Sequence, residues 1–286
     1  ISTSSVGPTE FASFEGSGAS EVTFQSPVGI DLVVTGQYDL GTGWTLAGTP
    51  GTLTFLAGAN LIFDNALLTN NTSNTKWDYV GTATTGDVRL NNSALVTGFG
   101  GNVTLTAAAP GGNINLVDAL GNLSVLKTSE AGGNITLTAG HDVVSPSAAS
   151  PLAGTIDPNV VLGGIRLDGP GNLTIQAGND VRGGLVQGVL SGPGFVLTNG
   201  TANVTAGRNI GAPRPVEASA TDPDEYANLT LGKGTINLTA QTGSIYLGRV
   251  QDKGVVDANR LRTFTAVSYT HLRAHETKAN LVCRLL

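Results

Sequence analysis

The chain has 286 residues, of which 40 are Gly and only 13% are charged, and its formal net charge is −6. Met is absent and Val, Ile, Leu and Thr are abundant, so the composition argues against helical domains and predicts strands. The acidic balance disfavours a nucleic acid or an anionic membrane as partner, and no apolar run approaches the roughly 18–20 residues that span a bilayer.

The first hundred residues show a weak strand pattern. Residues 52–68, TLTFLAGANLIFDNALL, alternate apolar and polar positions as half-buried strands do. Residues 69–87 break this pattern and contain TKWDYVG, with Trp77 and Tyr79. Exposed aromatic rings stack on sugars and fill protein interfaces, so Trp77 and Tyr79 are the candidate ligand-stacking residues. The alternative is that they anchor a loop on the shaft.

A short repeat dominates the middle of the chain. The unit Gly-Asn-[Val/Ile/Leu]-[Thr/Ser/Asn]-[Leu/Val/Ile] begins at Gly101, Gly112, Gly121, Gly133 and Gly171, and looser copies continue to Gly243. Within a unit, Val103 and Leu105 alternate with Thr104, which predicts strands with one buried side. Two successive steps between units cover 20 or 21 residues (11 + 9 and 9 + 12). We therefore predict an all-β parallel β-helix with coils of about 20 residues, and a β-sandwich is the alternative.

Proline-rich segments interrupt the repeat. Residues 144–164 and 211–228 are rich in Pro, which cannot donate a ladder hydrogen bond, and together with residues 69–87 they are predicted to be loops outside the coils. The second segment contains the densest acids, Asp222, Asp224 and Glu225. These acids fit either a glycosidase carboxylate pair or, as we favour, an acidic loop.

Polar turns follow several strands. His141-Asp142 and Asn179-Asp180 fit a calcium or catalytic turn, but a β-turn whose side chains bond the local backbone is favoured. Arg166 and Asp168 are expected to form a surface ion pair. No catalytic residue, cofactor site or metal site is predicted. Because Asn turns the chain and Thr points outward, the repeat creates Asn-x-Thr sequons automatically, as at Asn102.

The last twenty residues differ from the rest. Residues 267–286, VSYTHLRAHETKANLVCRLL, resemble a translated sequencing adapter and hold the only Cys, Cys283, so they are excluded from functional reasoning. Residues 1–266 then carry 15 − 3 = 12 basic and 21 − 1 = 20 acidic residues, a net charge of −8. We expect 1–266 to be a single β-helix shaft fragment, less regular in 1–99 and most regular in 100–250. Both of its ends are expected to expose coil edges that favour aggregation.

The strings GGNITLTAGHDV and GNLTIQAGNDV resemble the repeats of filamentous-haemagglutinin-like exoproteins, which are exported by two-partner secretion, and the passengers of autotransporters. The resemblance covers residues 46–247. It implies a non-enzymatic adhesin shaft, secreted or displayed outside the Gram-negative outer membrane. It also implies an outer-membrane transporter as export partner and a glycan or protein receptor on host cells, matrix or other bacteria. The alternatives are a β-helical polysaccharide-active enzyme and a surface-layer or matrix protein.

Overall fold

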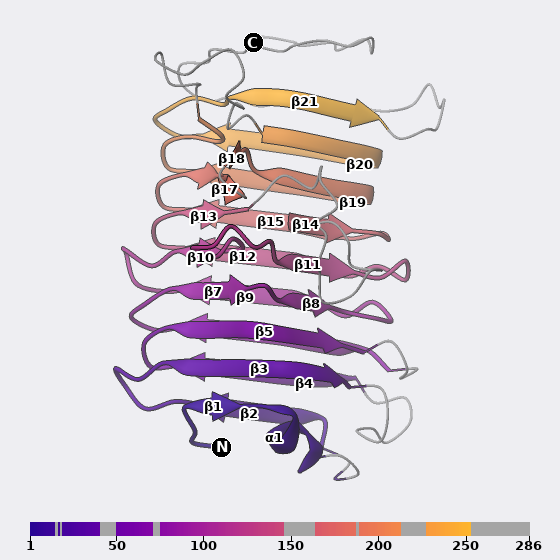
Figure 1. Ribbon diagram of the computed structural model, residues 1–286. Coiled ribbons are helices and arrows are strands. Elements are labelled where there is room, and N and C mark those ends of the chain that lie inside the picture. The colour runs from indigo at the N-terminus through magenta and orange to yellow at the C-terminus, as the bar shows by residue number, and fades with distance from the viewer. Residues whose placement is uncertain are drawn as a thin grey trace.

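The structure is a computed structural model that describes residues 1–14, 17, 19–40, 50–70, 75–145, 164–186, 189–212 and 227–252. In this part of the chain, nineteen strands form one sheet whose pairings are all parallel, and the sheet winds into a solenoid (Figure 1). The predicted parallel β-helix is therefore confirmed. Among the described residues, no helix has the length and apolar character to cross a membrane.

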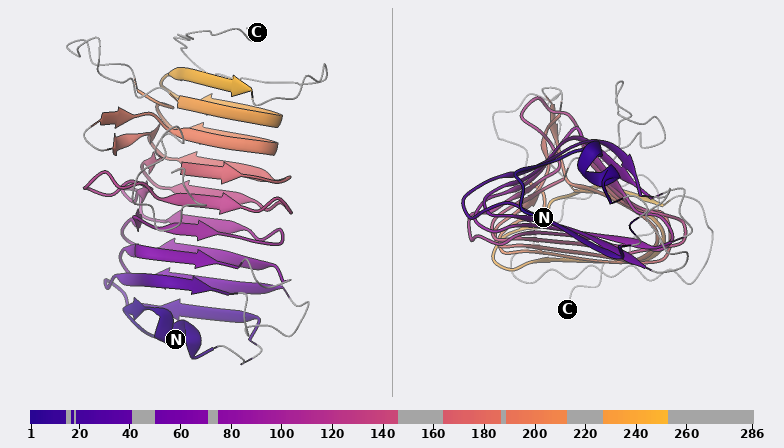
Figure 2. Two further views of the ribbon diagram at one scale, coloured as in Figure 1. Left: turned by 45° about the vertical axis from the view of Figure 1, so that its right-hand side comes forward. Right: turned by 90° about the horizontal axis from the view of Figure 1, so that it is seen from below.

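Each coil contributes strands to three faces, which enclose a three-sided core when seen along the axis (Figure 2). Face A contains β2 (Glu21–Gln25), β4 (Gly51–Ala57), β6 (Trp77–Ala83), β9 (Val103–Ala107), β12 (Ile135–Ala139), β15 (Asn172–Ala177) and the second halves of β19 (Gly194–Ala206) and β20 (Ala227–Ala240). Face B contains β1 (Ser5–Val6), the first halves of β3 (Leu32–Asp39) and β5 (Leu61–Thr69), β7 (Val88–Asn91), β10 (Ile114–Asn115), β13 (Val143–Val144) and β16 (Val181–Arg182). Face C contains the remaining halves of β3, β5, β19 and β20, with β8 (Ala94–Val96), β11 (Val125–Thr128), β14 (Gly164–Leu167) and β21 (Leu247–Asp252).

The period-2 alternation of each strand builds the core. On face A the inward residues of successive coils stand in register and form columns that run along the solenoid. One column consists entirely of alanine: Ala57, Ala83, Ala107, Ala139, Ala177, Ala206 and Ala240. Val103 and Leu105 are buried and Thr104 faces outward, as the sequence predicts. Burying a side chain of the size of Leu or Val stabilises the fold by roughly 1.5–3 kcal/mol, so these columns supply the main driving force.

The coils are longer than the predicted 20 residues. Equivalent corner residues on neighbouring coils, joined by hydrogen bonds, lie between 26 residues apart (Asp87 and Asn113) and 38 residues apart (Asp142 and Asp180). The prediction failed because the Gly-Asn unit occurs at three different places in a coil. Asn102 begins a face A strand, Asn113 sits at the opposite corner, and Asn122 belongs to a tight turn closed by Asp118.

The N-terminal end of the solenoid is partly covered, whereas the sequence predicts an exposed coil edge there. The helix α1 (Pro8–Ala12) lies across the first coil (Figure 2), and its Phe11 is fully buried. The Phe11 ring stacks on Tyr38 with centroids 5.0 Å apart and meets Phe24 edge-on at 5.6 Å. The chain start also pairs with β2, because Thr3 N donates to Gln25 O at 2.8 Å. A separate antiparallel hairpin, β17 (Gly184–Val186) and β18 (Val189–Ser191), stands outside the parallel sheet.

Candidate functional site

Trp77 and Tyr79 do not form a ligand-stacking surface. They lie in β6 rather than in a loop, and their side chains are 0% and 1% exposed. Both the predicted role and the predicted loop are therefore wrong for these residues. The sequence did contain a signal of this burial, namely the period-2 alternation within β6. Its inward positions are Trp77, Tyr79, Gly81 and Ala83, as in the other strands of face A.

The register explains how such large rings fit inside the coil. Gly51 pairs with Trp77, and a Cβ at Gly51 would lie 2.5 Å from the indole ring, so only glycine leaves room. Burial raises the pKa of the Tyr79 phenol well above its usual value, and the negative charge of Asp39 raises it further. Tyr79 therefore stays neutral and acts as a packing residue.

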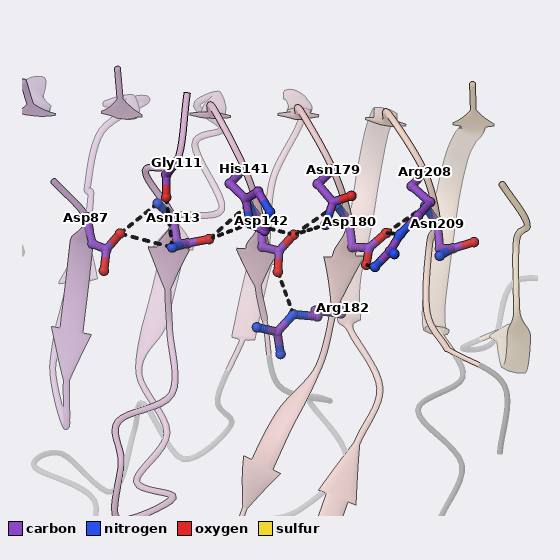
Figure 3. A network of polar contacts seen from close by, with 10 residues as sticks. All are labelled: Asp87, Gly111, Asn113, His141, Asp142, Asn179, Asp180, Arg182, Arg208 and Asn209. Atoms are coloured by element: carbon purple, nitrogen blue, oxygen red, sulfur yellow. Dashed lines mark hydrogen bonds and ion pairs between the residues drawn. The ribbon is translucent and has the colours of Figure 1, made fainter. Parts of the chain in front are cut away.

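The polar groups instead gather along the corner between faces A and B. Here a carboxylate or carboxamide oxygen of one coil accepts a hydrogen bond from the backbone N–H of the equivalent residue in the next coil, at 2.8–3.1 Å (Figure 3). We name this series the corner ladder; its members are Asp31, Asn60, Asp87, Asn113, Asp142, Asp180, Asn209 and Ser244. The ladder satisfies backbone donors that the turn would otherwise leave without a partner at a buried corner.

The Asp142 carboxylate contacts four residues, His141 of its own coil and Asn179, Asp180 and Arg182 of the next coil (Figure 3). Its Oδ1 accepts from Asp180 N at 3.1 Å and from Asn179 Nδ2 at 2.9 Å. Its Oδ2 accepts from Arg182 Nε at 2.8 Å, and the neighbouring Asp180 binds Arg208 in the same way. The chain bends at both places, but the side chains bond the next coil rather than their own turn, so the favoured interpretation of a locally bonded β-turn is wrong.

The corner ladder lowers the pKa of two of its carboxylates. For Asp142, burial pushes the pKa upward, but hydrogen bonds from Arg182, Asn179 and the Asp180 backbone outweigh burial and bring the pKa below its usual value. For Asp87, burial is likewise outweighed by hydrogen bonds from Asn113 and Arg89. Both groups are therefore ionised near neutral pH and serve as acceptors only.

A glycine column precedes the corner ladder in three consecutive coils, at Gly140, Gly178 and Gly207. A Cβ on Gly140 would lie 1.9 Å from Ala109 O, one on Gly178 would lie 2.0 Å from Gly140 O, and one on Gly207 would lie 2.0 Å from Gly178 O. The backbones of neighbouring coils approach so closely here that no side chain fits between them. This packing explains why the Ala-Gly pair recurs at Ala139-Gly140, Ala177-Gly178 and Ala206-Gly207.

A second ladder runs along the outer side of face A. Asp78 Oδ1 accepts from Asn102 N at 2.8 Å, Asn102 Oδ1 accepts from Asn134 N at 2.9 Å, and Asn134 Oδ1 accepts from Asn172 N at 2.9 Å. The sequon carboxamides of Asn102 and Asn134 are therefore already used to join coils. Beside this ladder, outward Thr residues align across β9, β12 and β15.

The remaining predicted sites fall into two groups. Arg166 and Asp168 form the predicted ion pair, with Nε 2.6 Å from Oδ1, and Lys127 Nζ lies 3.2 Å from Asp168 Oδ2. Asp222, Asp224, Glu225 and residues 267–286 lie outside the described residues. Within the described ranges, no group of three or more His, Cys, Asp or Glu side chains is arranged to hold a metal ion.

Comparison with protein-family models, curated proteins and solved structures gives no significant match to this chain.

Proposed function

We propose that the chain is a shaft segment of a secreted bacterial surface adhesin. The observation that carries this proposal is the corner ladder, which joins neighbouring coils from Asp31 to Ser244 along the described solenoid. Each added coil lengthens such a solenoid by about 4.8 Å, so the architecture suits a spacer that holds other parts of a protein away from a surface.

The polar residues also support a structural role rather than a catalytic one. His141 Nδ1 lies 3.2 Å from both Asn113 Oδ1 and Asp142 Oδ1, and the Asp142 carboxylate binds three groups from the next coil. A general base needs a lone pair directed at its substrate, whereas these lone pairs are directed at the neighbouring coil.

The proposed location is outside the Gram-negative outer membrane, reached through an outer-membrane transporter. The solenoid supports this route, because each coil contacts mainly its neighbours and can be added as the chain emerges. The proposed partners at the surface are glycans or proteins of host cells, matrix or other bacteria.

Labelling of intact cells of the source bacterium tests the location. Antibodies against the purified chain should label intact and permeabilised cells equally, and disruption of the transporter gene should abolish the surface label. Label that appears only after permeabilisation would contradict the proposal.

Two in-frame deletions test the shaft role. Removal of Val103–Asn134, which is 134 − 103 + 1 = 32 residues and one full coil, joins Asn102 to Ile135 and preserves the register of faces A, B and C. Cells with this deletion should still attach to their target. Removal of Val103–Asp118, half that length, breaks the register and should abolish surface display. Loss of attachment with normal display after the full-coil deletion would show that these residues bind the target directly.

A further inference from the structure

From β9 to β20, the outer side of face A is an uncharged array of hydroxyl and amide side chains. We name as the threonine face its outward residues on β9, β12, β15, β19 and β20: Asn102, Thr104, Thr106, Asn134, Thr136, Thr138, Asn172, Thr174, Gln176, Thr201, Asn203, Thr205, Thr235, Asn237 and Thr239. All are partly or fully exposed. Their alignment across strands is set by the parallel register.

We propose that the threonine face is a self-association surface on which a second copy of this chain docks, so that two shafts lie side by side. This inference rests on the proposed shaft role, and it names another copy of the shaft as partner.

Charge is the first argument. The chain has a net charge of −6, yet the threonine face contains no ionisable residue. Charged side chains lie elsewhere, for example Arg89 on face B, Lys127 on face C and Asp78 on the neighbouring face A strand β6. Two acidic rods repel each other wherever like charges meet, and that repulsion is least where the threonine faces meet.

The rigidity of the array is the second argument. Threonine is β-branched and loses little rotamer freedom on binding, so the association costs little side-chain entropy. Neighbouring amides also hold one another in place, as Asn237 Nδ2 donates to Asn203 Oδ1 at 2.8 Å. A regular surface of this kind can pair with its own copy, because the same spacing recurs on both partners.

The area sets the expected strength. Strands are about 4.8 Å apart and residues about 3.3 Å apart, so five strands of five residues present roughly 400 Å². A stable interface buries about 800 Å² per partner, and weak, transient ones bury less. The pairing should therefore be weak and reversible for this chain and should strengthen in a longer shaft with more coils.

Sedimentation velocity over a range of concentrations tests the proposal on the full 286-residue chain. The wild type should show a reversible monomer–dimer equilibrium. The variant Thr104→Lys/Thr174→Lys/Thr239→Lys places one lysine on each of three non-adjacent strands and should raise the dissociation constant at least tenfold. Circular dichroism of each variant confirms that the fold is retained.

A matched control separates the face from the overall charge. Val28→Lys/Leu120→Lys/Thr198→Lys changes exposed residues that are not part of the threonine face and brings the net charge to the same value, −6 + 3 = −3. This control should dimerise like the wild type. Equal loss of dimer in both variants, or a wild type that stays monomeric, would overturn the proposal of self-association without affecting the proposed shaft role. A threonine face that binds a neutral polysaccharide instead of a second copy would leave the wild type monomeric.

A proximity test uses cysteines in a Cys283→Ser background. In the Thr136→Cys variant, oxidation should give a disulfide-linked dimer far faster than in the Thr198→Cys variant. Equal rates would show that the two faces do not meet.

Discussion

Replacement of Asp142 tests the corner ladder at a carboxylate that bonds three residues of the next coil. Asp142→Ala removes the oxygens that accept from Asp180 N, Asn179 Nδ2 and Arg182 Nε. Asp180 is only 6% exposed, so water reaches its N–H poorly. An unsatisfied buried donor costs about 1–3 kcal/mol and each lost hydrogen bond about 0.5–1.5 kcal/mol, so we expect a loss of about 3 kcal/mol in the free energy of unfolding.

Asp142→Asn is the informative comparison. Asn occupies the same ladder position in other coils, at Asn113 and Asn209, where its Oδ1 accepts the backbone N–H. The Asn variant should therefore keep the contact with Asp180 and lose only the charge contact with Arg182, a loss of about 1 kcal/mol. Asp118→Ala, in an exposed turn, is the control and should cost less than the ladder substitution.

Urea denaturation monitored by circular dichroism measures these differences, analysed with a nearest-neighbour scheme because solenoid coils can unfold separately. Equal losses for Asp142→Ala and Asp142→Asn would refute the reasoning, since they would show that the ion pair matters and the backbone contact does not.

Three further predictions follow from the packing and the charges. Gly178→Ala places a Cβ 2.0 Å from Gly140 O and should lower the free energy of unfolding by at least about 3 kcal/mol or prevent folding. Gly111→Ala is the control and should change little, because a Cβ there meets nothing within 4 Å. The urea midpoints of the two variants measure the difference. Phe11→Ala removes the aromatic contacts of α1 and should lower the free energy of unfolding by about 3–5 kcal/mol. Amide hydrogen exchange in β1 and β2 should increase, and unchanged exchange there would contradict the role of α1 in covering this end. The pKa values of Asp87 and Asp142 are lowered in the fold, so both carboxylates stabilise the folded state above their unfolded pKa near 4. This stabilisation should be lost as the pH falls through the lowered folded pKa, and an acid titration of the free energy of unfolding measures the loss. An Asp87→Asn/Asp142→Asn variant whose titration matches that of the wild type would contradict this prediction.

Strand identity and fold class could be predicted from the sequence because they depend on local alternation. Val103, Thr104 and Leu105 show which side faces the core before any coil is assembled. Coil length depends on which turns stack, and the sequence alone does not distinguish the Gly-Asn of a strand start from that of a corner. Aligning the Ala-Gly pairs at Ala139-Gly140 and Ala177-Gly178 would have revealed the longer coil, because Gly140 and Gly178 form the glycine column.

Site prediction failed at the aromatic residues for a related reason. Trp77 and Tyr79 were assigned by residue type to a binding surface, although their alternation with Asp78 and Val80 places them inside. The corner ladder could not be predicted from one coil, since each of its hydrogen bonds joins residues at least 26 positions apart. Hydrophobic periodicity reports on one strand, whereas polar ladders depend on the register between strands.

Thiol cross-linking tests the register between neighbouring coils most directly. In a Cys283→Ser background, Asn102→Cys/Asn134→Cys places the thiols on adjacent coils, 32 residues apart. Asn102→Cys/Asn122→Cys places them 122 − 102 = 20 residues apart, where a 20-residue coil would bring them together. A short bifunctional thiol reagent should join the first pair within one chain and leave the second pair unlinked. Efficient linkage of the second pair, with none of the first, would contradict the three-faced solenoid described above.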